Sequence, residues 1–327
     1  MTPTTTPRVL TVDTLEPAAD PTMYFIGVTT GQSSIMSAFP VWAEALGLDA
    51  RIVGIDLPLD DTVEHYRRVV DFIAGDEHSL GALVTTHKLN LYKAAKDRFH
   101  GVGEDTALLD EVSSISKRDG RLWGHAMDPI TSGLSLEAIV DDGYWARTGG
   151  HLLLLGAGGS SLALTLYLHR RQQSGQDVPE RVVVTNRRPG RLAEMREVHQ
   201  RIGLQLPIDY RVAPTPDRND AALADLPAGS VVANATGLGK DRPGSPLTDA
   251  AAWPEAGIAW DFNYRGDLIF LHQARAAGVE AVDGWLYFVH GWTRVIAEVF
   301  HLDIPTHGAG FEHLSDLIRP LSGRTEP

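Results

Sequence analysis

The loop 156–159, Gly-Ala-Gly-Gly, has the residue types and spacing of a loop that holds phosphate groups. It follows four leucines, Leu152–Leu155, which are typical of a strand buried on both faces. Gly156 can take the tight turn, and Gly158 and Gly159 let a pyrophosphate approach the backbone. Ser160 then opens a helix whose N-terminal N–H groups favour anions. We therefore expect a nucleotide site, with a purely structural strand–helix turn as the alternative.

A cluster of arginines follows the next expected strand and indicates which dinucleotide would bind. The strand Arg181–Thr185 is followed by Asn186, Arg187 and Arg188, and Arg191 lies three residues on. An acidic residue here would accept the ribose 2′-hydroxyl of NAD, whereas arginine suits the 2′-phosphate of NADP. We expect NADP, and the alternative is a solvated basic loop.

Lys88 is the residue whose position favours proton transfer. It follows the short strand Ala82–Thr85 and opens a helix, and ligand groups in open α/β sheets gather at the carboxyl ends of strands. A lysine there can exchange a proton with a carbonyl/alcohol pair, or it can be an ordinary surface lysine. A lysine at a helix N-terminus is electrostatically unfavourable, which argues against the second interpretation.

Two further loops carry polar side chains. Asp128 is either a residue near the N-cap of a helix or the carboxylate partner of a catalytic lysine, and the sequence leaves both open. Asn234 and Thr236 follow a buried strand, where they could bond the ribose or the carboxamide of the cofactor. A polar turn is the alternative for that loop.

Strands and helices alternate along nearly the whole chain, which predicts an α/β fold with parallel sheets. We expect an α/β substrate-binding domain at 23–130 and a Rossmann-like, doubly wound NADP-binding domain at 131–284. The segment 285–327 is expected to form helices that return to the first domain. Residues 1–22 are rich in Thr and Pro and are expected to be a disordered tail.

Composition excludes several functional classes. The formal net charge of −13 argues against nucleic-acid binding, and no apolar stretch reaches the length of a membrane span. The chain has no cysteine, which excludes disulfides and thiolate chemistry. Its 13 histidines show no metal-binding spacing, so we expect no metal. In the absence of a signal peptide we expect a cytoplasmic protein.

Taken in order, these motifs resemble those of the shikimate dehydrogenase family over about Tyr24–Ile304. The segment Gly81–Lys88 is similar to the family's catalytic lysine motif, one residue shorter and without its proline. The segment Gly124–Asp128 is similar to its catalytic aspartate motif. The other matching segments are Gly156–Ala163, Asn186–Arg191, Asn234–Thr236, Asp261–Tyr264 and Asp283-Gly284. The resemblance implies that Lys88 and Asp128 handle the proton, that NADP carries the hydride, and that Gly284 belongs to the cofactor site.

The sequence departs from the family mainly where the family binds its substrate. Of the family's two serines Ser33 remains, and Ile35 stands at the second position unless a shift of one residue recovers Ser34. Ser113 and Ala126 stand where the family has asparagines, and Gly291, beside His290, stands where it has a glutamine. The resemblance then implies that the substrate-binding residues are Ser33, Ser34, Thr85, Ser113, Tyr264 and His290.

Each lost buried hydrogen bond typically costs ~1 kcal/mol, so these changes together would weaken shikimate binding strongly. We expect an alcohol dehydrogenase that keeps the family's chemistry on a different cyclic polyol or hydroxy acid, shikimate-, quinate- or cyclitol-like. One alternative is a true shikimate 5-dehydrogenase with divergent contacts, and another is a non-catalytic, NADP-binding regulatory protein. The expected partner is a small cyclic molecule, and a homodimer stays open as the assembly.

Overall fold

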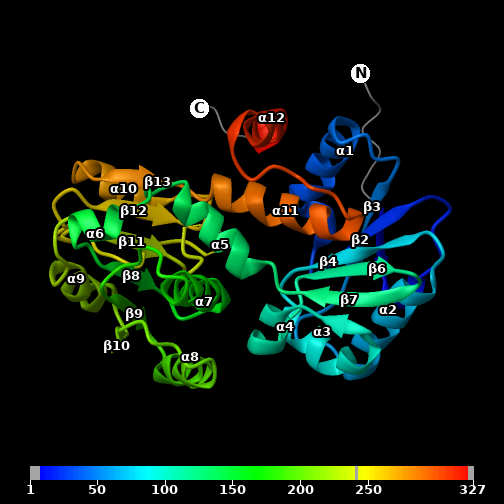
Figure 1. Ribbon diagram of the computed structural model, residues 1–327, viewed down its shortest axis with the longest axis horizontal. Coiled ribbons are helices and arrows are strands. Elements are labelled where there is room, and N and C mark those ends of the chain that lie inside the picture. Colours follow the sequence, from blue (N-terminus) through cyan, green and yellow to red (C-terminus); the bar gives the residue numbers. More distant parts are fainter. Residues whose placement is uncertain (1–7, 240–241, 323–327) are drawn as a thin grey trace. The chain divides into compact units, whose positions relative to one another are not determined.

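The computed structural model describes residues 8–239 and 242–322, which form two compact units (Figure 1). The first unit comprises residues 1–127 and 291–327, and the second comprises residues 128–290. Each unit has its own sheet and core. The sequence places the domain bounds at residues 130 and 284, whereas this division places them at 127/128 and 290/291. The functional domain bounds stay a prediction.

The first unit is built on a seven-stranded sheet of order β1-β3-β2-β4-β6-β7-β5. β1 to β4 are mutually parallel, β6 runs antiparallel to both β4 and β7, and β5 pairs in parallel with β7. The strands are β1 (Val9–Thr11), β2 (Thr22–Gly27), β3 (Arg51–Asp56), β4 (Ser79–Val84), β5 (Gly101–Val102), β6 (Ser114–Arg118) and β7 (Arg121–His125).

Helices cover both faces of this sheet (Figure 1). On one face, buried side chains of α2 and α3, such as Tyr66 and Leu91, join the core with Ile26 of β2. On the other, Trp42 of α1 donates its indole N–H to the carbonyl of Leu314 in α12 at 2.8 Å. The helices assigned here are α1 (Ile35–Ala45), α2 (Val63–Gly75), α3 (Lys88–Ala95), α4 (Glu104–Leu109) and α12 (Gly308–Ile318).

The C-terminal segment packs on the first unit, as predicted. Trp292, on α11 (Trp285–Phe300), makes an edge-on ring contact with Phe25 of β2 at a centroid distance of 5.3 Å. Phe300 at the end of α11 contacts Phe39 of α1 at 5.9 Å. These aromatic contacts bury the face of the sheet that α2 and α3 leave uncovered.

The prediction that residues 1–22 form a disordered tail is wrong for the part that the structure describes, residues 8–22. Val9–Thr11 form β1, which pairs in parallel with β3, and Leu10 and Val12 are 5% exposed in the core. The pairing with β3 and the burial of Leu10 and Val12 hold this three-residue strand on the sheet. Residues 1–7 lie outside the described residues, so the prediction is not examined there.

The second unit is the predicted doubly wound sheet, with six parallel strands in the order β10-β9-β8-β11-β12-β13. The chain order reverses between β8 and β11, and ligands of such sheets bind at the carboxyl ends of the strands beside this point. The strands are β8 (Leu152–Leu155), β9 (Val182–Asn186), β10 (Ile208–Val212), β11 (Val231–Asn234), β12 (Ile258–Asp261) and β13 (Glu280–Val282).

Alternate residues of these strands face two separate cores. Leu152 and Leu154 pack with α5, α6, α7 and α8, whereas Leu153 and Leu155 pack with α9 and α10. All four leucines are 0% exposed, so the apolar run was correctly interpreted as a strand buried on both faces. The helices are α5 (Asp128–Glu137), α6 (Tyr144–Thr148), α7 (Gly159–Gln173), α8 (Pro189–Arg201), α9 (Pro216–Ala224) and α10 (Ile269–Ala276).

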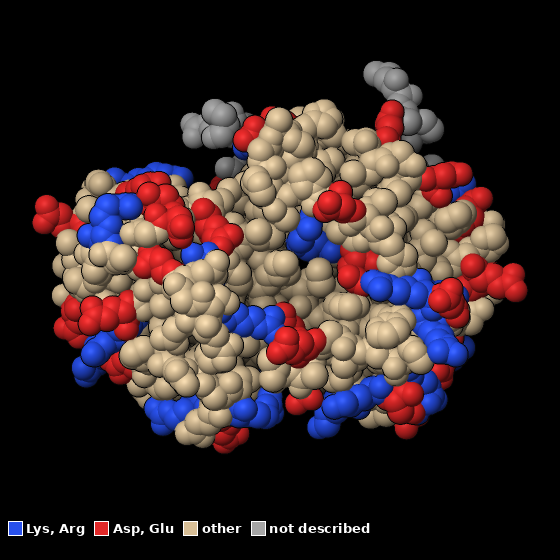
Figure 2. Space-filling view, in the orientation of Figure 1, with Lys and Arg blue, Asp and Glu red and all other residues tan. Residues whose placement is uncertain are grey.

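The surface carries both signs of charge. Figure 2 shows acidic and basic side chains interspersed over the face in view. None of the described helices is long and apolar enough to cross a membrane.

Candidate active site

The glycine turn lies where β8 passes into α7. Gly156 has a φ of 111°, and a Cβ atom there would lie 2.9 Å from the carbonyl oxygen of Ala235. Gly158 precedes the first residue of α7, Gly159, and a Cβ at either would meet nothing within 4 Å. Gly156 is therefore required by the backbone, whereas the next two glycines border open space beside the helix N-terminus.

A cavity of about 420 Å³ opens along this turn at the carboxyl ends of β8, β9 and β11. Its walls include Arg187, Arg188, Arg191 and Arg242, and no carboxylate side chain is among the described residues that line it. The remaining lining residues are Gly156, Ala157, Gly158, Thr185, Asn186, Ala213, Pro214, Thr215, Pro216, Asn219, Ala235, Thr236, Leu238, Ser245 and Pro246.

Side-chain contacts hold the loop that carries Arg187 and Arg188 and the first turn of α8, which carries Arg191. The Asn186 carboxamide oxygen accepts the backbone N–H of Arg188 at 2.9 Å, which fixes the start of α8. Arg191 forms an ion pair with Glu194 at 2.6 Å. The open glycine turn, the helix N-terminus and the lining arginines together fit an anionic dinucleotide.

Asn234 and Thr236, predicted as cofactor contacts, have different surroundings. Thr236 lines the cavity, and both its N–H and its hydroxyl donate to the Asn234 carboxamide oxygen, at 3.1 and 2.6 Å. Asn234 itself is 0% exposed and donates to Asp261 at 2.9 Å. Asn234 thus shapes the loop that presents Thr236, and it is not among the residues that line the cavity.

Asp261, the last residue of β12, is a buried carboxyl to which the sequence assigned no role. Its oxygens accept the backbone N–H and the side-chain amide of Asn263, both at 2.8 Å, besides the bond from Asn234. Burial raises the pKa of Asp261 to about 6, although these hydrogen bonds act in the opposite direction. Its place at a strand end was visible in the sequence, but its burial was not.

Gly284 and Tyr264 lie beyond the cavity's lining residues. A Cβ on Gly284 would lie 2.1 Å from the carbonyl oxygen of Phe262, so this glycine allows two backbone segments to touch. The Tyr264 ring packs on Trp285 and Phe288, with centroids 5.7 and 4.6 Å away. His290 lies on α11 and is 2% exposed. Ser160, also predicted, lies in the first turn of α7.

In the first unit, a tight turn places Lys88 at the start of α3. Thr85 follows β4 directly, and its N–H donates to the carbonyl of Ile26 at 3.0 Å. Thr86 has a φ of 40°, a left-handed conformation that is strained for a β-branched residue. His87 is 1% exposed and bonds Tyr66 and the Leu57 carbonyl. Burial lowers the pKa of His87, so this histidine is an uncharged residue of the core.

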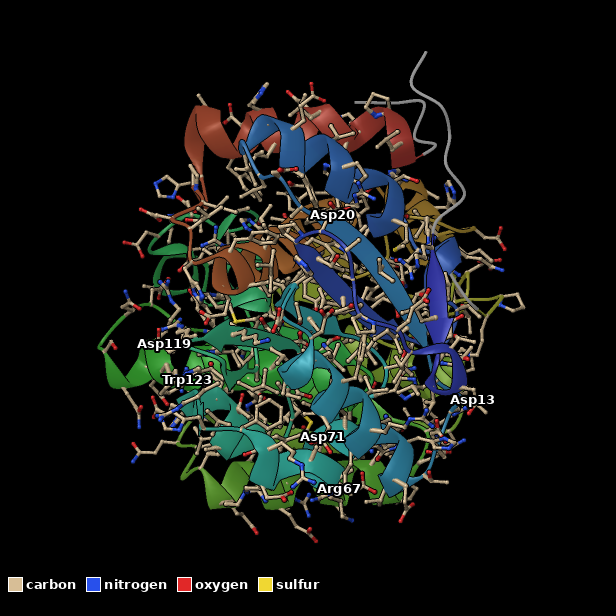
Figure 3. All side chains as sticks on the ribbon, turned by 90° about the vertical axis from the view of Figure 1, so that its right-hand side faces the viewer. Asp13, Asp20, Arg67, Asp71, Asp119 and Trp123 are labelled. Carbon is tan, nitrogen blue, oxygen red and sulfur yellow. The ribbon has the colours of Figure 1, made fainter. Side chains whose placement is uncertain are left out.

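Ser113 connects the β6–β7 hairpin to the start of α5. It is 3% exposed, accepts the N–H of Met127 at 2.7 Å, and donates to the carbonyl of His125 at 3.3 Å. Figure 3 labels Asp119 at the tip of this hairpin and Trp123 on β7. Because its hydroxyl is engaged on both sides of the turn, Ser113 holds the chain that leads directly into Asp128, the first residue of α5.

The predicted serines Ser33 and Ser34 are half-buried and lie between the 3-10 turn Thr30–Gln32 and α1, with Ser34 as the N-cap residue. They and Thr85 belong to the first unit, and the dinucleotide cavity belongs to the second. Lys88 falls in the first unit and Asp128 in the second, so their pairing stays a proposal. Among the described residues, no group of three or more His, Asp or Glu is placed to hold a metal ion.

Comparisons with known proteins give a consistent result, although no protein-family model matches the chain. The NADP(+) shikimate dehydrogenase of Thermus thermophilus is 28% identical over 253 residues, which cover 77% of this chain and 81% of that protein. The NADP(+) shikimate dehydrogenase of Methanothrix thermoacetophila is 32% identical over 188 residues, which cover 57% of this chain and 60% of that protein.

Solved structures show the same fold. The quinate dehydrogenase of Corynebacterium glutamicum, solved in complex with NAD, superposes with a TM-score of 0.70 at 17% identity. The match covers 91% of this chain and 98% of that one. Fold, motif order and curated relatives agree, and the chain is similar to the shikimate dehydrogenases.

Proposed function

We propose that the protein is an NADP-dependent alcohol dehydrogenase that interconverts a hydroxyl and a ketone on a cyclic polyol or hydroxy acid. The observation that carries the proposal is the cavity beside the β8–α7 turn, whose described walls bear four arginines and no carboxylate. The curated relatives are named for NADP(+) and shikimate, which supports this cofactor and substrate class.

The proposed roles divide between the two units. The glycine turn and Thr236 hold the body of the dinucleotide, while Arg187 and Arg188 face its 2′-phosphate. When bound there, NADP(H) would supply the hydride-transfer chemistry at the carbinol carbon in either direction. Lys88 takes the hydroxyl proton during oxidation and donates it during reduction. The Asp128 carboxylate stabilises the charge on Lys88 and orients it.

The substrate is proposed to be related to shikimate, with quinate-like and cyclitol-like molecules as the other members of the class. Ser113 supports a substrate other than shikimate itself. Its hydroxyl donates to the His125 carbonyl and accepts the Met127 N–H, so both bonds go to the backbone. A hydroxyl so engaged has no donor left for a substrate hydroxyl and keeps one acceptor lone pair.

The test is steady-state kinetics with NADP(+) on a panel of shikimate, quinate and cyclitols, using the wild type and Lys88→Ala. We expect Lys88→Ala to lose a factor of about 10²–10⁴ in kcat while NADP(+) affinity is kept. Lys93→Ala is the matched control, because Lys93 is exposed on the same helix. Near-normal turnover by Lys88→Ala would remove this lysine from the mechanism.

The panel also separates the alternatives. A micromolar KM for shikimate with rapid turnover would identify a true shikimate 5-dehydrogenase and refute the changed substrate. Tight NADPH binding by the wild type with no turnover on any cyclic alcohol would favour a non-catalytic regulatory protein.

A further inference from the structure

Arg242 is a cavity-lining cation that neither the motifs nor the family resemblance singled out. It lies in the loop after β11, where the N–H of Gly239 donates to the Arg242 carbonyl at 2.8 Å and a β-bridge joins Leu238 to Arg242. These two contacts fix its backbone. We propose that Arg242 binds the pyrophosphate of the dinucleotide, an inference that rests on the proposed NADP site.

The Arg242 guanidinium contacts the backbone segment that follows β11. Its Nη2 donates to the carbonyl oxygen of Thr236 at 2.7 Å and lies 3.9 Å from where a Cβ on Gly237 would be. The same stretch of backbone touches the glycine turn, since a Cβ on Gly156 would lie 2.9 Å from the Ala235 carbonyl oxygen. The cation and the turn therefore flank one backbone segment and line one cavity.

The strand order decides which phosphate Arg242 meets. β8, which carries the glycine turn, lies between β9 and β11 in the sheet. Arg187 and Arg188 follow β9, the strand that receives the adenine ribose in this type of fold, so they face the 2′-phosphate. Arg242 follows β11, on the opposite side of the turn, and the anion nearest to that side is the pyrophosphate.

The chemistry of the side chain fits this role. A guanidinium has five N–H donors in a planar fork, and one of them holds Thr236 in the structure. The other donors suit the bidentate geometry of phosphate oxygens. Arg242 is exposed, so the gain in affinity is that of a solvent-accessible charge-assisted contact, about tenfold.

The experiment compares ligands that carry the two anions separately. NAD(+) has the pyrophosphate without the 2′-phosphate, 2′-AMP has the 2′-phosphate without the pyrophosphate, and NADP(+) has both. Dissociation constants are measured by calorimetry, or by displacement of fluorescent NADPH for weak ligands. The variants are Arg242→Ala and Arg242→Lys, with Arg275→Ala as control, because Arg275 is an exposed arginine at the C-terminal end of α10 and outside the cavity lining.

We expect Arg242→Ala to weaken NADP(+) and NAD(+) by the same factor of about ten, with 2′-AMP unchanged. Arg242→Lys should lie between the wild type and Arg242→Ala, and Arg275→Ala should match the wild type. Unchanged affinities in Arg242→Ala, or weaker NADP(+) and 2′-AMP with unchanged NAD(+), would overturn the proposal. A wild type that binds no NADP(+) would instead overturn the proposed function itself. Equal thermal unfolding temperatures confirm that the variants are folded.

Discussion

Asp261 should make the second unit less stable as the pH rises from 4 to 7. The carboxyl is 0% exposed, and burial raises its pKa from 3.8 to about 6. The native state therefore keeps the proton over a range in which the unfolded chain releases it. Stability from this group is complete below about pH 3 and is lost as the pH rises through 6.

The magnitude follows from the shift. One pKa unit corresponds to about 1.4 kcal/mol, so the full shift is worth about 3 kcal/mol, of which about 2.5 kcal/mol is lost from the unfolding free energy between pH 4 and 7. Groups with a lowered pKa act in the opposite direction. Glu298 is one of these, because His125, Ser116 and Arg118 stabilise its charge more than burial opposes it. A comparison with a variant is needed to isolate Asp261.

The assay is urea unfolding at several pH values, followed by circular dichroism and by tryptophan fluorescence, for the wild type and Asp261→Asn. The unfolding free energy of the wild type minus that of the variant should fall by about 2.5 kcal/mol from pH 4 to 7, because the other titrations cancel. Asp142→Asn is the control, since the Asp142 side chain is 94% exposed. A difference that is flat, or that rises with pH, would refute the assignment of a raised pKa to Asp261.

Three further outcomes test other parts of the description. Thr86→Gly should stabilise the protein by up to about 1 kcal/mol in urea unfolding, because its left-handed φ of 40° is strained; a loss of stability would contradict the strain. Ser113→Ala should cost about 1–2 kcal/mol and lower kcat with unchanged NADP(+) affinity, whereas the neighbouring, buried Ser114→Ala should do neither; equal effects would refute the anchoring role. Replacing Arg187 and Arg188 by serine should weaken NADP(+) about 100-fold and NAD(+) little, and equal losses would exclude a 2′-phosphate contact.

The parts of the fold that were predicted correctly are those with strong local patterns. The leucines of β8 and the alternation of strands and helices determined the second sheet, because apolar runs bounded by glycine turns have few other interpretations. The strands that were missed, β1, β5 and β13, have two or three residues. Such strands are held by a neighbouring sheet edge, which a local pattern does not describe.

The sequence indicated which residue types form the candidate site, but not which neighbours surround each of them in the fold. Gly156 and the arginines after β9 line one cavity, as their positions at strand ends indicated. Sequence alone did not reveal that Asn234 is turned toward Asp261, because that contact joins residues 27 positions apart. Arg242 lies in a loop with no periodic pattern, and only the folded loop brings it to the Thr236 carbonyl.

The short strand β1 has a consequence for anyone who shortens the chain. Starting a protein at residue 23 would discard β1, uncover the hydrogen-bonding edge of β3 and remove Leu10 and Val12 from the core. An uncovered edge of a parallel sheet invites pairing with a second molecule. Such a fragment should aggregate or exchange strands between copies, whereas a natural edge of only three residues, with Thr11 exposed, offers little template for association.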